Sequence, residues 1–241
     1  MTQELPASMA LAWGREKAGS RGPRKGLTVE TIVEAACAIA QSGGLAAVSM
    51  ARVAKELGFT TMSLYRYIDS KDLLVELMAD YALGVPPDFG RGGDWRERLR
   101  AVAVAEFERV LGLDWWLKMP ISGAPTGPNN MLWLESLLAS LSETPLSEVQ
   151  KVQLALNTSL YVIGRARLLV DVGNGDDVDF RTVMPGVLDA ERFPAILAAI
   201  EGGGFDGLGD SWESDEFSFG LDQLLDGIDV MIARQSATGT H

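Results

Sequence analysis

The sequence predicts an all-α fold, in which a small N-terminal helical unit precedes a larger helical domain. Apolar residues recur at helical spacing in nearly every long segment, capping residues and glycines bound these segments, and no segment shows convincing strand alternation. The chain has 241 residues, of which 47% are hydrophobic, so it can bury a sizeable core. We therefore expect about nine or ten helices in two domains.

The first unit is predicted to span residues 27–84, after a basic, flexible arm at 1–26. Thr28, Ser49 and Ser70 are good N-caps, and glycines follow each helix that they start. The first three helices form a three-helix domain, and the fourth belongs to both units. The four helices are expected at 28–43, 49–58, 60–67 and 70–84.

The larger domain, residues 85–241, is predicted to contain about six more helices. Segments rich in Gly, Pro, Asp or Ser separate them and are predicted to be loops, at 120–128, 174–179 and 202–214. The helices are expected at 94–110, 113–118, 129–141, 147–172, 190–200 and 217–232.

Charge is distributed unevenly along the chain. Its 21 Lys and Arg and 33 Asp and Glu give a formal net charge of −12, which by itself argues against a nucleic-acid-binding protein. Residues 11–71, however, contain nine basic and five acidic residues. This segment therefore carries +4 and the rest of the chain −16, which indicates one end that faces a polyanion. The alternative is that residues 15–25 are an ordinary solvated tail.

Residues 49–68 have the pattern of a helix-turn-helix. Val53, Ala54 and Leu64 can pack where two short helices cross, so the second helix presents a polar face to a DNA major groove. Short hydroxyls suit phosphate oxygens, and Arg66 suits guanine. The alternative is an αα-corner of an ordinary helical protein. The residues predicted to contact DNA are Arg21, Arg24, Lys25, Ser49, Arg52, Thr60, Thr61, Met62, Ser63, Tyr65, Arg66, Tyr67 and Lys71.

Residues 27–83 resemble the DNA-binding domain of the TetR family of bacterial transcriptional regulators. The most specific part is Ser63-Leu64-Tyr65-Arg66-Tyr67, followed by Ser70-Lys71-Asp72-Leu73-Leu74. The resemblance implies a cytoplasmic, ligand-responsive regulator, by family default a repressor, with no enzymatic activity and no cofactor. Such a regulator binds a palindromic double-stranded DNA operator as a homodimer and is released by a small apolar or aromatic effector.

The remainder resembles, more weakly, the ligand-binding and dimerising domain of the tetracycline-repressor branch. Gly127-Pro128-Asn129 and the ending Phe217-Ser218-Phe219-Gly220-Leu221-Asp222 carry this resemblance. The tetracycline repressor uses histidine to help hold a metal-chelated drug, whereas the single histidine of this chain is its last residue, His241. We therefore expect no metal site and no metal–tetracycline ligand.

Large aromatic and flexible side chains in the larger domain suit a pocket for an apolar or aromatic molecule, and Arg165 suits a ligand carboxylate or hydroxyl. The alternative is that these residues are ordinary core and that the arginine pairs with surface acids. The residues predicted to contact the ligand are Phe107, Leu111, Trp115, Trp116, Met119, Met131, Trp133, Leu137, Tyr161 and Arg165.

The family resemblance also implies a four-helix dimer interface, formed by residues 147–172 and 215–234 of each subunit. Two-fold pairing places two recognition helices about one duplex turn apart, roughly 34–36 Å. The alternative is that these apolar stripes are buried within one subunit. The predicted interface residues are Leu160, Ile163, Gly164, Phe217, Leu221, Leu224, Ile228 and Met231.

Several other classes of protein are disfavoured. The single cysteine, Cys37, and the terminal histidine exclude an internal disulfide, a cysteine-cluster metal site and a Ser–His–Asp triad. Residues 202–207 match G-x-G-x-x-G in letters but follow a helical pattern rather than a strand. No apolar run is long enough to span a bilayer. The remaining rival function is a helical adaptor whose basic end binds an acidic partner.

Overall fold

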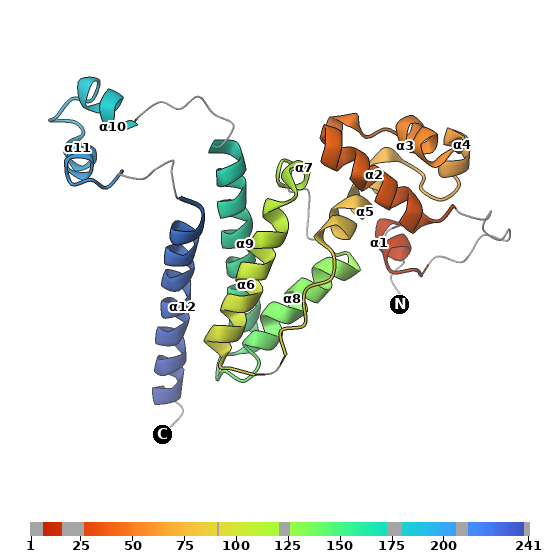
Figure 1. The fold of residues 1–241 in the computed structure, drawn as a ribbon. Coiled ribbons are helices and arrows are strands. Elements are labelled where there is room, and N and C mark those ends of the chain that lie inside the picture. The colour runs from red at the N-terminus through yellow and green to blue at the C-terminus, as the bar shows by residue number, and fades with distance from the viewer. Residues whose placement is uncertain are drawn as a thin grey trace.

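The computed structural model describes residues 7–15, 27–90, 92–120, 126–172, 180–205 and 212–238. Within these ranges it contains helices and no strand, which confirms the predicted fold class. Figure 1 shows a small helical unit beside an elongated helical bundle. The small unit comprises α1 (Ala7–Ala12), α2 (Val29–Gly43), a 3-10 turn (Leu45–Ala47), α3 (Met50–Leu57), α4 (Thr61–Leu64) and α5 (Lys71–Leu83).

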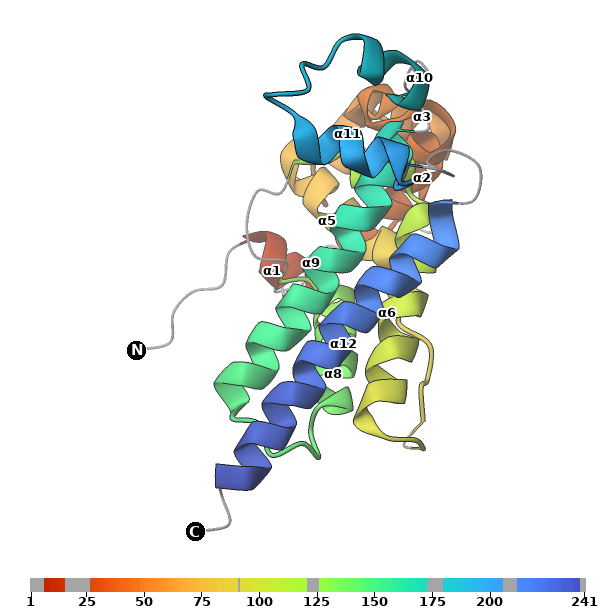
Figure 2. The ribbon, with the colours of Figure 1, turned by 90° about the vertical axis from the view of Figure 1, so that its left-hand side faces the viewer.

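The bundle follows α5 along the chain, and its long helices run beside one another (Figures 1 and 2). Two short helices, α10 and α11, lie between α9 and α12 in the sequence. The helices are α6 (Trp95–Leu111), α7 (Asp114–Leu117), α8 (Pro128–Ser140), α9 (Glu148–Val172), α10 (Phe180–Val183), α11 (Pro194–Glu201) and α12 (Trp212–Thr238), with a 3-10 turn at Met184–Gly186.

The helices of the small unit begin at the predicted caps. The side chains of Thr28 and Thr31 form a capping box, and the hydroxyls of Ser49 and Ser70 accept from backbone amides of α3 and α5. Gly58 adopts the left-handed conformation, with φ of 72°, and ends α3. Fully buried apolar residues from α2 to α5 form the core of this unit, among them Ile32, Val53, Leu64, Ile68 and Leu74.

The first 26 residues are not wholly a flexible arm. Helix α1 was not predicted, yet Leu11 and Ala12 pack against the core of the small unit, and Trp13 Nε1 donates to the Thr126 carbonyl at 2.9 Å. A six-residue helix has too few turns to show a periodic pattern and depends on tertiary contacts. Arg21, Arg24 and Lys25 lie outside the described residues.

Several boundaries of the C-terminal half also differ from the prediction, among them the end of α12, which lies at Thr238 rather than at residue 232. Helix α12 begins at Trp212, inside a segment predicted to be a loop, and α11 begins at Pro194 rather than Ala190. Pro194 occupies the first turn of α11, where its missing amide costs nothing. Helix α10 was not predicted.

The bundle has its own apolar core, built from α6, α8, α9 and α12. Leu99, Val102, Val162, Leu221 and Leu225 are fully buried there. Figure 2 shows α9 and α12 side by side on one face of the bundle. On α6, two arginines connect this helix to α12: Arg96 pairs with Asp226 and Asp229, and Arg100 pairs with Asp222.

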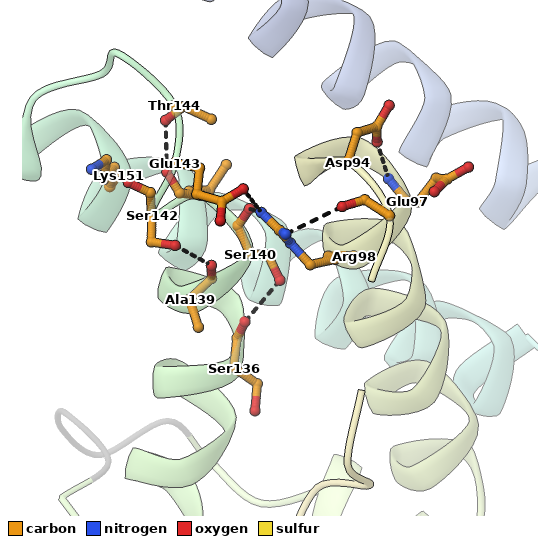
Figure 3. A network of polar contacts seen from close by, with 12 residues as sticks. Asp94, Glu97, Arg98, Ser136, Ala139, Ser140, Ser142, Glu143, Thr144 and Lys151 are labelled. Atoms are coloured by element: carbon orange, nitrogen blue, oxygen red, sulfur yellow. Dashed lines mark hydrogen bonds and ion pairs between the residues drawn. The ribbon is translucent and has the colours of Figure 1, made fainter. Parts of the chain in front are cut away.

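At one end of the bundle, cations hold the C-terminus of α8. Arg98 of α6 donates to the carbonyl oxygens of Gly93 and Ser140, at 3.2 and 3.4 Å, and pairs with Glu143 at 3.3 Å (Figure 3). Lys151 of α9 donates to the Ser142 carbonyl at 3.1 Å. Positive charge is favourable at a helix C-terminus, so this end of α8 is fixed to α6 and α9.

Candidate nucleic-acid interface

The turn between α3 and α4 places the outer face of α4 at the surface. Phe59 N donates to the Ala54 carbonyl at 2.8 Å, which closes the end of α3 behind Gly58. Leu64 of α4 and Val53 of α3 are both fully buried, so one face of each helix is covered by the unit's own core. The opposite face of α4 is therefore directed to solvent.

Helix α4 ends at Leu64 rather than Tyr67, so the predicted DNA-contacting residues lie on α4, at its N-cap Thr60 and in the turn that follows it; they differ in exposure. The Met62 side chain is 75% exposed, and Tyr65 and Arg66 are exposed as well. The Thr60 and Ser63 hydroxyls bond each other at 2.9 Å on the same surface. Thr61 is half-buried. Tyr67 is also half-buried and packs against the core.

The remaining described cations of this surface lie on α3 and α5. Arg52 is exposed in the first turn of α3, beside its cap Ser49, and Lys71 is exposed at the first residue of α5. Within the described parts of the chain, Arg52, Arg66 and Lys71 form no ion pair, whereas Arg96, Arg98 and Arg100 of α6 all do. Unpaired cations keep all their donors available to phosphates or base edges.

The C-terminal turn of α5 is held by side chains of the bundle. Trp116 Nε1 donates to the Ala79 carbonyl and Trp133 Nε1 to the Gly84 carbonyl, each at 3.0 Å. The guanidinium of Arg109 donates to the carbonyls of Ala82 and Leu83. Trp116 and Trp133 were predicted to contact a ligand; the structure shows that their indole N–H groups hold the helix that connects the two units.

Asp80 joins α5 to the N-terminus of α8. Its buried carboxylate accepts from the backbone amides of Asn129 and Asn130, at 3.2 and 2.9 Å, and from the Asn130 side chain at 2.7 Å. The dipole of α8 favours an anion at this position. Gly127 caps α8 so close to Asp80 that a Cβ would overlap the carboxylate. Sequence reasoning missed Asp80, although Gly127-Pro128 marks a helix start with free amides.

A cleft of about 620 Å³ opens beside this junction. Leu83 and Gly84 at the end of α5, Arg109 of α6 and Trp133 of α8 are among its lining residues. The groups that hold the connecting helix are therefore reachable from solvent.

An aromatic stack lies deeper, between α6, α9 and α12. The rings of Phe107 and Phe217 are parallel within 9°, with centroids 3.9 Å apart. Tyr161 stacks on Phe217 at 5.6 Å and donates its hydroxyl to the Phe217 carbonyl at 2.8 Å. Gly220 makes this possible, because a Cβ there would overlap the Tyr161 hydroxyl. Arg165 pairs with Glu216 at 2.7 Å beside the stack.

The structure distributes the predicted ligand residues over two cores. Trp115 is buried in the core of the small unit, where its Nε1 donates to Gln41 Oε1 at 3.2 Å, and Met119 packs against the same core. Both face the DNA-binding helices rather than the bundle interior, because α7 lies between the two units. Leu111 and Met131 are half-buried. The bundle core brings together Phe107, Trp133, Leu137 and Tyr161.

The face formed by α9 and α12 carries exposed apolar side chains. Leu160 is 59% exposed and Phe219 69% exposed. Val149, Val152 and Leu156 are exposed at spacings of three and four residues that lead along α9 to Leu160. We call six exposed residues the apolar stripe: Val149, Val152, Leu156 and Leu160 on α9, and Phe219 and Val230 on α12.

Three of the predicted dimer residues are already covered within the chain. Phe217, Leu221 and Ile228 are buried in the bundle's own core, so they have no surface to offer a partner. Leu160 and Gly164 are exposed, and Ile163, Leu224 and Met231 are half-buried. The spacing of Val149, Val152 and Leu156 was a signal that the sequence analysis did not use.

Neither a metal-binding cluster nor a membrane-spanning helix is found among the described residues. No group of three or more His, Cys, Asp or Glu residues there is placed to hold a metal ion. None of the described helices is long and apolar enough to cross a membrane.

The sequence matches two protein-family models, one for each unit. Residues 32–78 match bacterial regulatory proteins of the tetR family, and residues 86–232 match the tetracyclin repressor-like C-terminal domain. The chain is 34% identical over 245 residues to the HTH-type transcriptional repressor DrrR1 of Streptomyces coeruleorubidus, covering 96% of the chain and 88% of that protein. It is 28% identical over 220 residues to an HTH-type transcriptional regulator of Saccharopolyspora erythraea, covering 90% of each.

Solved structures show the same fold. ActR of Streptomyces coelicolor in complex with actinorhodin superposes with a TM-score of 0.72 at 23% identity, over 87% of this chain and 98% of ActR. BioQ with its double-stranded DNA operator superposes with a TM-score of 0.58 at 21% identity, over 83% of this chain and 97% of BioQ.

Proposed function

Because the chain belongs to the TetR family of bacterial transcriptional regulators, we propose that it binds a palindromic operator as a homodimer and that a small apolar or aromatic effector releases it. The family membership makes the chain a DNA-binding helix-turn-helix regulator rather than an enzyme. The operator symmetry, the dimer and the effector are our proposals. The observation that carries DNA binding is the outward face of α3 and α4, with its unpaired cations, and the apolar stripe on α9 and α12 supports the dimer.

We assign the contacts with DNA by exposure and chemistry. Arg66, exposed in the turn that follows α4, has the planar donor pair that recognises guanine in the major groove. Arg52 and Lys71 lie at the starts of α3 and α5 and bind phosphates on either side of α4. Tyr65 and Met62 supply apolar contacts to bases.

The dimer forms through the apolar stripe. A row of exposed apolar side chains along two adjacent helices is unfavourable in water and is typical of an interface. Added Cβ atoms at Gly164 and Gly227 meet nothing within 4 Å, so these two positions leave space for a partner helix. Two-fold pairing of α9 and α12 then produces a four-helix interface and doubles the DNA contacts.

The effector acts through α8. A molecule bound beside Phe107 and Tyr161 would favour one packing of the bundle over another. The C-terminus of α8 is fixed by Arg98, so a change in packing moves its N-terminus, and Asp80 transmits that movement to α5. Coupling of this kind is typically worth about 1–3 kcal/mol. The solved complexes of ActR with actinorhodin and with (S)-DNPA support a small-molecule effector.

A gel-shift titration with the DNA that flanks the gene tests the DNA part of the proposal. We expect a specific complex that survives excess unrelated competitor DNA and weakens steeply as salt is raised, because several phosphate contacts release counterions. A complex that competitor DNA removes as readily as the labelled fragment would contradict it.

The rival function, an adaptor for an acidic protein, depends on the same cations. It predicts no discrimination between the flanking fragment and a scrambled fragment of equal length. The gel shift with both fragments therefore separates the two functions.

A further inference from the structure

Glu106 of α6 is a buried acid that forms no ion pair with any residue that the structure describes. Glu106 is only 3% exposed and lies inside the bundle. One carboxylate oxygen, Oε1, accepts from the Ser159 hydroxyl of α9 at 2.6 Å. The other, Oε2, has no hydrogen-bond partner among the residues that the structure describes.

Burying the Glu106 carboxyl group with one oxygen unpartnered costs free energy. Burial raises the pKa of its carboxyl from 4.5 to about 7, and the Ser159 hydroxyl opposes that shift only in part. Asp80 is also buried, yet hydrogen bonds reach both of its oxygens. A buried oxygen that lacks a partner costs free energy, and such groups concentrate at functional sites.

Aromatic side chains of the bundle core lie close to Glu106. The next residue, Phe107, stacks on Phe217. On α9, Tyr161 lies two residues beyond Ser159 and stacks on the opposite helix as well. The acid and the aromatic stack thus both link α6 to its neighbours within one turn of helix.

We propose that Glu106 binds a cationic nitrogen of the effector, so that the effector is an aromatic molecule carrying a protonated amine. The proposal rests on the proposed function, because it concerns the effector of the same regulator. An N⁺–H donor forms a charge-assisted hydrogen bond with Oε2, so binding of a cation favours the ionised carboxylate over the protonated form that burial favours. The same charge disfavours an acidic effector.

Two fluorescent tricyclic probes of similar shape test this proposal with the full-length protein. One is 9-aminoacridine, a cation near neutral pH, and the other is acridone, which is neutral. We expect the wild type to bind 9-aminoacridine at least about tenfold more tightly than acridone. Glu106→Gln should lose at least about tenfold in affinity for the cation and leave acridone binding within about twofold.

Glu108→Gln is the matched control, because Glu108 lies on the same helix but is exposed. It should bind both probes like the wild type. Equal affinity of the wild type for the two probes, binding of neither probe, or retention of the cation by Glu106→Gln would each overturn the proposal. If the Glu106→Gln variant does not fold, the relative affinity of the wild type for the two probes still tests the proposal.

The operator gel shift, run without probe, keeps the two proposals apart. Specific DNA binding together with no preference for the cation would reject the role of Glu106 and leave the proposed regulator intact. Loss of specific DNA binding in the wild type would reject the proposed function itself.

Discussion

Two buried carboxylates, Asp80 and Glu106, show how hydrogen bonding at single residues separates roles in this protein. The Asp80 carboxylate accepts hydrogen bonds from two backbone amides and one side-chain amide, so it fixes α5 to α8. The Glu106 carboxyl group accepts one hydrogen bond, from a hydroxyl, and its second oxygen has no partner among the described residues. The same distinction applies to arginine among the described residues, because Arg96 and Arg100 of α6 form ion pairs and Arg66 does not.

Arg66→Ala should weaken specific operator binding by at least about tenfold, equivalent to roughly 1–3 kcal/mol, because a bidentate contact with guanine is lost. Binding to unrelated DNA should weaken much less. Gel shifts with the flanking and scrambled fragments measure both. Arg192→Ala serves as the control, because Arg192 is exposed near α11, outside the helix-turn-helix. Equal losses on both fragments would reassign Arg66 to the DNA backbone.

Glu106 should make folding stability depend on pH. Because its pKa is about 7 in the folded protein and 4.5 ordinarily, the folded state holds a proton that the unfolded state has released. Stability therefore falls as pH rises from about 4.5 to about 7, by up to about 3 kcal/mol. Urea unfolding of wild type and Glu106→Gln, at one protein concentration, should show this loss in the wild type only. Parallel pH profiles for the two proteins would contradict it.

At the scale of elements, α8 is held at both ends, and the bundle holds α5 at its C-terminal turn. Arg98 fixes the end of α8 to α6, and Asp80 fixes its start to α5. Three more side chains donate hydrogen bonds to carbonyls at the C-terminal end of α5, namely those of Trp116, Trp133 and Arg109. A shift of the bundle helices is thus transmitted to the helix that follows α4.

Gly127→Ala should separate α8 from α5, because the added Cβ overlaps the Asp80 carboxylate. We expect a loss of about 1–3 kcal/mol in the free energy of unfolding, as amides at the start of α8 lose their acceptor. Operator affinity should fall as well. Chemical denaturation and gel shifts measure the two effects. Gly186→Ala, where nothing lies within 4 Å, should be neutral; similar behaviour of both variants would refute the role of this contact.

At the scale of the whole molecule, charge and apolar surface divide the chain into distinct faces. Unpaired cations gather on the helix-turn-helix of a protein whose net charge is −12. The apolar stripe lies on α9 and α12 of the bundle. A negative body limits nonspecific adhesion to DNA, so binding depends on a correctly spaced pair of recognition helices.

Leu160→Glu should convert the dimer to a monomer, because it places a charge in the middle of the apolar stripe. Specific operator affinity should then fall by at least about a hundredfold, since one helix-turn-helix makes half the contacts. Light scattering gives the mass, and a gel shift gives the affinity. Val187→Glu adds the same charge at an exposed apolar position outside the stripe and should change neither. A Leu160→Glu variant that stays dimeric would exclude this interface.

Local patterns determined the all-α class, the caps at Thr28, Ser49 and Ser70, and the helix-turn-helix with its polar outer face. These features depend on neighbours within about one helical turn, which the sequence displays directly. Only the tertiary structure decided that Phe217 and Leu221 are covered by their own chain while Leu160 and Phe219 are exposed. It also decided that Asp80 meets α8 and that Oε2 of Glu106 has no hydrogen-bond partner in the described part of the chain. The physical reason is that burial and hydrogen bonding depend on contacts between distant segments. The type of a side chain indicates that it needs an apolar or polar contact, but it does not identify the segment that provides the contact.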